Sequence, residues 1–418
     1  MQLRTPVLLL LTLAGSTFIA AQTAPVNPKL FSDMKWREIG PMRAGRTRAL
    51  TGVPSQPATF YLGMVNGGVW KTTDAGATWE SVWDSQPTGS IGSIAVADSD
   101  PNIVYVASGE GLQRPDLSTG DGVYKSTDAG KSWTHLPGLR DGQQIGQIAI
   151  DPKDANKVFV AVTGHPYGPN EERGLYLSHD GGLTFKRVLY TNNRTGASEV
   201  QIDPQHPNIV YAGMWQRQEA PWENGSFIGA EGGFYKSTDG GETFAKLTGH
   251  GLPDDILQIQ LAIAPTDSKR MYAEIGTVRG PVLLMRTDDG GENWREVSGN
   301  LPTDFGFAID VHAHEPETIY VVPIKSDSEH FPLGGELRVY RSRTGGNEWE
   351  PLAKGLPEKD CYVNVLRDAM AVDTLDDCGI YFGTTGGQVY GSSDGGDSWA
   401  PIVRDLPAVL SLEVQTLA

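Results

Sequence analysis

The chain has 418 residues but only two cysteines, Cys361 and Cys378. Cys361 precedes the apolar segment Val363–Val372, which we predict to be a strand, and Cys378 stands just before the next strand. In an antiparallel hairpin these positions lie at opposite ends of strands roughly 20 Å long, far beyond the ~7 Å between Cα atoms that a disulfide allows. We therefore expect two free thiols.

Positive charge and long apolar runs are also scarce. The chain has 34 Lys and Arg against 51 Asp and Glu residues, a formal net charge of −17. Nucleic acid and membrane insertion are therefore not expected, because no basic stripe is available to neutralise phosphates and the apolar run Val7–Leu13 is too short to span a bilayer. With Arg4 before it and Ala20–Ala21 after it, this run predicts a signal peptide over residues 1–21 and a secreted or periplasmic protein.

Glycine and a repeated phrase are abundant instead. The 51 glycines and 27 prolines suit a turn-rich sheet protein. The phrase Ser/Thr-x-Asp-x-Gly-x-x-Trp/Phe recurs every 50 to 59 residues in six copies, with a degenerate seventh copy at Ser342–Trp349. A period of this length holds four short strands with their turns, which predicts an all-β, seven-bladed β-propeller. The aspartates of the six copies are Asp74, Asp128, Asp180, Asp239, Asp289 and Asp394.

The phrase has a structural meaning. An Asp that accepts hydrogen bonds from following residues, with a Gly free to adopt positive φ, closes a tight turn, and the final aromatic residue packs into the blade. Seven apolar hairpins between these turns predict the two inner strands of each blade. We expect an N-terminal linker over residues 22–33 and one propeller over residues 34–418. Either surplus segment, Trp36–Ile39 or Leu410–Val414, can close the ring.

The variable connections between the second and third strands predict a functional face opposite the Asp turns, because binding residues concentrate on variable loops. Trp and guanidinium groups there suit a sugar or a peptide, whereas Arg43 and Arg46 enter the first inner strand, toward the channel. No catalytic pair can be assigned, and the carboxylates in question are Glu110, Glu171 and Asp368. The ligand-binding candidates are Arg43, Arg46, Arg114, His165, Arg173, Trp215, Arg217 and Trp222.

No cofactor and no metal site are predicted. Glu110, Asp116 and Asp121 lie close in the sequence, but the spaced oxygen ligands of a calcium loop are missing, so calcium there stays an open alternative. The expected partner is a glycan or a protein segment, bound by a monomer.

The repeated phrase resembles the Asp-box, or BNR repeat, of bacterial sialidases, sortilin-type receptors and xyloglucanases. Residues 34 to about 300 resemble the first propeller of exported bacterial glycosyl hydrolase-like or sortilin-type proteins, through Gly67–Asp74 and Gly120–Ser126. Residues 303–417 resemble exo-sialidase-like proteins through Asp304–Gly306 and Tyr381–Tyr390. In these families the box lies away from the ligand, so the resemblance implies a fold more than a reaction.

The chain differs from these families at the residues that the resemblance would make catalytic. The sialidase Arg-Ile-Pro signature is missing, and Asn66 stands where the matching turn of xyloglucanases carries a catalytic Asp. The second carboxylate of xyloglucanases lies in a second propeller, which we do not expect here.

We therefore expect first the binding of an extracellular glycan or protein segment. A glycoside hydrolase, sialidase- or xyloglucanase-like, is the alternative, and an assembly or scaffold factor is the second. A pair of carboxylates at the channel mouth, one with a raised pKa, would favour the hydrolase.

Overall fold

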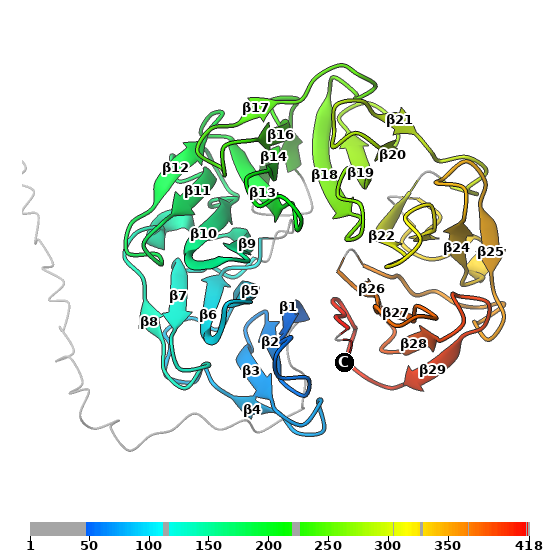
Figure 1. Ribbon diagram of the computed structural model, residues 1–418, viewed down its shortest axis with the longest axis horizontal. Helices are drawn as coiled ribbons and strands as arrows, with labels where there is room; N and C mark the ends of the chain where they lie inside the picture. Colours follow the sequence, from blue (N-terminus) through cyan, green and yellow to red (C-terminus); the bar gives the residue numbers. More distant parts are fainter. Residues whose placement is uncertain are drawn as a thin grey trace, which may run out of the picture. The chain divides into compact units, whose positions relative to one another are not determined.

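The protein is a seven-bladed β-propeller in which the blades follow one another around the ring in chain order (Figure 1). The computed structural model describes residues 47–111, 117–219, 226–303, 305–326, 329–366, 368–414 and 416. The segments expected to be a signal peptide and a linker lie outside these residues, as does Trp36–Ile39. Each blade is an antiparallel sheet of four strands from one continuous piece of chain, the first strand innermost. The predicted fold class is confirmed.

The strands of blades 1 to 4 have the following bounds: β1 (Thr47–Gly52), β2 (Phe60–Met64), β3 (Gly68–Thr72), β4 (Glu80–Ser81); β5 (Ile91–Ala97), β6 (Asp100–Ser108), β7 (Val123–Ser126), β8 (Thr134–His135); β9 (Ile145–Asp151), β10 (Asp154–Val162), β11 (Gly174–Ser178), β12 (Lys186–Leu189); β13 (Thr195–Ile202), β14 (Val210–Glu219), β16 (Gly233–Ser237), β17 (Ala245–Lys246). A fifth strand, β15 (Ser226–Ile228), pairs with the end of β14.

Blades 5 to 7 continue the pattern: β18 (Ile256–Ile263), β19 (Met271–Thr277), β20 (Leu283–Thr287), β21 (Arg295–Glu296); β22 (Gly306–Val311), β23 (Ile319–Pro323), β24 (Val339–Ser342), β25 (Glu350–Leu352); β26 (Met370–Val372), β27 (Ile380–Gly383), β28 (Val389–Ser392), β29 (Ala400–Val403). Two short 3₁₀ turns lie between strands, η2 (Arg140–Gly142) and η3 (Leu333–Gly335). None of the described helices is long and apolar enough to cross a membrane.

The repeated phrase forms the turn between the third and fourth strands of each blade, which we name the Asp turn. In blade 2, Asp128 accepts the amide of Ser132 at 2.9 Å and its hydroxyl at 2.6 Å, while the Ser126 hydroxyl accepts the amide of Gly130 at 2.8 Å. Gly130 has φ 85°, a conformation that glycine adopts at little cost. The hydrogen bonds from Ser132 lower the pKa of Asp128 to about 2.

The same turn recurs in the other blades, and in one of them a hydroxyl takes the place of the Asp carboxylate. Asp74, Asp180, Asp239, Asp289 and Asp394 accept the amide four residues on at 2.8 to 3.0 Å. In the degenerate copy of blade 6 the hydroxyl of Thr344 accepts the amide of Glu348 at 3.0 Å. A hydroxyl can therefore replace the carboxylate, with fewer hydrogen bonds.

Asp128→Ala is expected to lower the free energy of unfolding by about 1 to 3 kcal/mol, because the turn loses its carboxylate acceptor. Thr344→Ala is the matched control and should cost less, since that side chain makes fewer bonds. Urea unfolding of both variants checks the order. Equal costs would mean that the carboxylate does not stabilise the turn.

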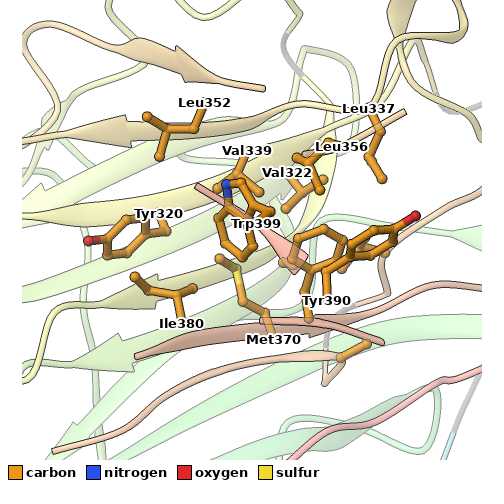
Figure 2. Packing of buried hydrophobic residues seen from close by; sticks show 14 of the residues in the cluster. Tyr320, Val322, Leu337, Val339, Leu352, Leu356, Met370, Ile380, Tyr390 and Trp399 are labelled. Atoms are coloured by element: carbon orange, nitrogen blue, oxygen red, sulfur yellow. The ribbon is translucent and has the colours of Figure 1, made fainter. Parts of the chain in front are cut away.

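The hydrophobic core lies between neighbouring blades. Figure 2 shows Tyr320 and Val339 of blade 6 packed against Ile380, Tyr390 and Trp399 of blade 7. Trp399 ends the last Asp turn and meets Phe382 edge to face at 5.1 Å. The aromatic residue of the phrase thus packs into the blades, as predicted.

Residues around blade 7 differ in part from expectation. Cys361 and Cys378 are free and buried, which confirms the prediction of two thiols. The predicted strand Val363–Val372 is shorter than expected, because the Ala369 amide turns back to the Leu366 carbonyl at 3.0 Å. Only Met370–Val372 forms β26.

The ring closes at blades 7 and 1 through the C-terminal segment. Ser411 forms a parallel bridge with Asp368, and its hydroxyl lies 3.4 Å from the carbonyl of Thr47 at the start of β1. The Leu412 amide donates to the Asp368 carbonyl at 2.6 Å. Figure 1 shows this segment at the inner side of the ring, beside β1 and β26. Of the two surplus segments, Leu410–Val414 takes the seam without completing a blade.

Candidate functional site

Arg173 joins the loops of blades 3 and 4 on the face opposite the Asp turns. It is 1% exposed, and its guanidinium donates to the carbonyls of Arg194 at 2.6 Å, Arg217 at 2.8 Å and His165 at 3.1 Å. Burial lowers the pKa of Arg173 to about 10, so the side chain stays charged at neutral pH. Arg173 therefore holds backbone together, and ligand contact by its guanidinium stays a prediction.

Trp215, Arg217 and Glu219 extend this group along β14. The Arg217 guanidinium lies 5.1 Å from the centre of the Trp215 ring, and its Nη2 lies 2.8 Å from Oε1 of Glu219. We predicted Trp215 on a loop, which is wrong: it lies in β14 and is 6% exposed. Trp215 pairs with Gly196 of β13, and β15 supplies the pairing partner that continues the strand to Glu219.

The structure brings four of the predicted residues together as a loop cluster, His165, Arg173, Trp215 and Arg217. Burial, followed by the charge of Arg173, lowers the pKa of the His165 imidazole. Arg43, Arg46, Arg114 and Trp222 lie outside the described residues.

The two predicted carboxylates of the loops, Glu110 and Glu171, accept hydrogen bonds from other loop residues. Glu110 is buried and accepts the amide of Ser118 at 3.1 Å. Glu171 is exposed and accepts the hydroxyl of Tyr190 at 2.8 Å. Catalysis by either group stays a prediction.

Asp368, the third predicted carboxylate, lies away from the loops, where β26 begins. Its Oδ2 forms an ion pair with Nη1 of Arg48 at 2.5 Å. Arg48 is the second residue of β1, so the pair joins blades 7 and 1. Inner strands begin on the face opposite the Asp turns, which places this pair toward that mouth of the channel. The Nε of Arg48 is buried and finds no hydrogen-bond partner among the described residues.

Two further carboxyl groups of the channel have raised pKa values. Asp310 belongs to β22, the inner strand of blade 6, and burial raises its pKa to about 7. Glu413 lies on the C-terminal segment, two residues after the bridge to Asp368. Burial, followed by the negative charges of Asp310 and Asp368, raises the pKa of Glu413 to about 7. Protein atoms surround Glu413, yet its surface remains exposed to solvent.

Glu199 is a fourth carboxyl in range of the charges on Asp368 and Arg48. Burial raises its pKa to about 8. Its Oε1 accepts the amide of Leu261 from the inner strand of blade 5 at 3.1 Å. Gln147 makes the equivalent bond one blade earlier, to the amide of Val200 at 2.8 Å. Protonated Glu199 therefore joins two neighbouring inner strands, as Gln147 does in blade 3.

Glu199→Gln is expected to stabilise the protein by about 1 to 3 kcal/mol at pH 8. The folded protein holds the Glu199 proton to a higher pH than the unfolded chain does, so the parent loses stability as the pH rises from about 4.3 to 8. A glutamine keeps the acceptor and has no proton to lose. Thermal unfolding of both proteins at pH 4 and pH 8 checks this, and an equal difference at the two values would contradict it.

The channel side chains Arg48, Asp310, Asp368 and Glu413 form what we name the channel site. Glu413, whose pKa is raised to about 7 in part by the charge of the ion-paired Asp368, gives a candidate proton donor and a candidate proton acceptor in the channel. Within the described residues no group of three or more His, Cys, Asp or Glu side chains has the arrangement of a metal site. The carboxylate of Asp121 accepts hydrogen bonds from the hydroxyls of Ser108 and Tyr124.

Sequence reasoning chose Asp368 but missed Asp310 and Glu413. The available signal was an ionisable residue within an apolar inner strand, as in Phe307–Val311. Glu413 had no such signal, because its place in the channel depends on how the C-terminal segment returns to Asp368.

No protein-family model matches the chain. A xyloglucanase from Paenibacillus sp is 25% identical over 325 residues, which are 68% of this chain and 29% of the relative. A xyloglucanase from Hypocrea jecorina (strain QM6a) is 24% identical over 334 residues, 72% of this chain and 37% of the relative. The chain thus spans about a third of the length of these relatives.

Among solved structures, the GH74 xyloglucanase from Xanthomonas campestris has a TM-score of 0.59 at 19% identity, over 86% of this chain and 55% of that chain. This likeness establishes a shared fold.

Proposed function

We propose that this protein is a secreted glycoside hydrolase that acts on a glycan of the xyloglucan class. The sequence favoured glycan or protein binding, with hydrolysis as the alternative, and the similarity to xyloglucanases supports the alternative better. The observation that carries the proposal is the channel site, where Glu413, with a pKa raised to about 7, lies near the ion-paired Asp368.

Each channel side chain takes a defined role in this proposal. Glu413 is protonated over much of the range below pH 7 and gives its proton to the leaving oxygen of the glycosidic bond. Asp368 accepts a proton from the attacking water, and the ion pair with Arg48 fixes its position. Glycosidases in general divide acid and base roles between two such carboxyl groups.

The turn between β2 and β3 does not supply this chemistry. Asn66 is exposed there with φ 60°, and its amide cannot act as a general base. The acid and base roles therefore go to the channel rather than to this turn.

Incubation of the purified protein with xyloglucan should release reducing ends. The rate should fall as the pH rises above 7, because Glu413 loses the proton that it donates. A reducing-sugar assay between pH 5 and pH 9 measures both. No release of reducing ends from xyloglucan or related β-glucans would overturn the proposal.

Glycan binding without hydrolysis is the second candidate, and the amide of Asn66 on the exposed turn favours it. Retention on a glycan with no release of reducing ends would select it. The sialidase-like, sortilin-type and scaffold alternatives stay predictions of the sequence alone.

A further inference from the structure

An open groove of about 480 Å³ lies on the outer part of the propeller between blades 2 and 3. One wall is the segment from Pro137 to Asp141, which leads from β8 toward β9. The other wall comes from blade 3, with Tyr176 of β11 and the Asp-turn residues from Leu183 to Phe185. The groove shares no lining residue with the channel site.

Leu183 is an exception among the repeats. The residue after the glycine of the phrase is Ala77, Lys131, Glu242, Glu292, Asn347 or Asp397 in the other Asp turns. In blade 3 it is a leucine with 64% of its side chain exposed. Leu183 therefore adds apolar surface to the edge of the groove, where the equivalent residues of the other repeats are polar or small.

The same position also lacks an ion pair that three other junctions have. Glu242, Glu292 and Asp397 each form an ion pair with a Lys or Arg of the preceding blade, at 2.7 to 3.0 Å. Leu183 has no group that can make this bond to blade 2. The blade 2 to blade 3 junction therefore lacks this ion pair, and Lys125 of blade 2 donates instead to the Gly181 carbonyl of the blade 3 Asp turn at 3.3 Å.

The lining combines flat apolar surface with polar groups of both signs. Tyr176 and Phe185 contribute rings, and Arg140, Asp141 and Glu172 contribute a guanidinium and two carboxylates. In the described structure no hydrogen bond or ion pair uses the charged groups of these three residues. Rings flanked by hydrogen-bonding donors and acceptors suit the apolar faces and hydroxyl groups of sugars.

We propose that this groove binds a segment of the polysaccharide chain, apart from the site of hydrolysis. The ligand class rests on the proposed function, while the groove itself rests on its volume and on its lining of rings and charged groups. Its volume lies within the roughly 300 to 1,000 Å³ of small-molecule sites, enough for a few sugar units. Binding at this groove holds the protein on the polymer without taking part in bond cleavage.

Affinity gel electrophoresis in xyloglucan compares the parent with Leu183→Glu, which installs the residue of the blade 4 and blade 5 turns. We expect Leu183→Glu to weaken retention by about fivefold or more, because the carboxylate needs water that a sugar face would displace. Glu242→Leu is the matched control at the same position one blade later, and its retention should equal the parent's. Arg140→Ala serves as a second groove variant that leaves the Asp turn unchanged.

Hydrolysis of a short soluble oligosaccharide is measured on the same proteins. Weaker retention of both groove variants with parental rates on the short substrate supports the groove. Parental retention of both, equal losses in Glu242→Leu, or a parent that xyloglucan does not retain overturns it. If the parent is retained through the groove but releases no reducing ends, the hydrolase proposal fails and the groove stands.

Discussion

Asp368→Asn should lower the rate of xyloglucan hydrolysis by about 10² to 10⁴, the range expected when a positioned general base is removed. The substitution keeps the size of the side chain but removes the charge that pairs with Arg48 at 2.5 Å. The attacking water then has no acceptor for its proton, and Arg48 no longer has a fixed partner. Initial rates of reducing-end release at pH 6 measure the effect.

Glu199→Gln is the control for this experiment. It also replaces a carboxyl of the inner strands, but one that is already protonated at pH 6. Glu199 is 5% exposed, and its Oε1 accepts the amide of Leu261. Its rate should stay within about twofold of the parent. Equal losses in both variants would show that the ring of inner strands, and not Asp368, limits the rate. A parental rate in Asp368→Asn would remove Asp368 from the reaction.

Arg173→Met should destabilise the protein by about 3 kcal/mol or more, the largest stability effect that we expect. The guanidinium supplies donors to the carbonyls of His165, Gly168, Arg194 and Arg217. Methionine fills much of the volume but removes four hydrogen bonds from a charged donor, each worth about 1.5 to 3 kcal/mol. The carbonyls of His165 and Gly168 keep the side-chain amide of Asn170 as a donor, and that of Arg194 keeps the Arg217 amide. Urea unfolding measures the loss.

Arg194→Met is the matched control, because the side chain of Arg194 is exposed while its carbonyl remains in place. It should change the free energy of unfolding by less than about 0.5 kcal/mol. If Arg173→Met is as stable as this control and binds glycan less well, Arg173 contacts the ligand and does not hold the loops.

The loop cluster shows why residue type and loop position were insufficient to predict which side chains are accessible to a ligand. Arginine and tryptophan on long connections favour ligand contact in general, yet Arg173 and Trp215 are 1% and 6% exposed. The sequence does not reveal that β14 continues to Glu219 or that β15 pairs with it. Backbone carbonyls that need donors are created only when the loops fold against each other, and Arg173 satisfies them.

The sequence by itself determined the number of blades, the Asp turns and the free thiols, because each follows from local spacing. A turn closed by Asp128 and Ser132 uses residues four positions apart, so its pattern is readable along the chain. The channel site depends instead on contacts over more than 300 positions, such as Arg48 with Asp368. Only ring closure brings these residues together and removes enough water to raise the pKa of Glu413, so the tertiary structure alone decided where the carboxyl groups meet.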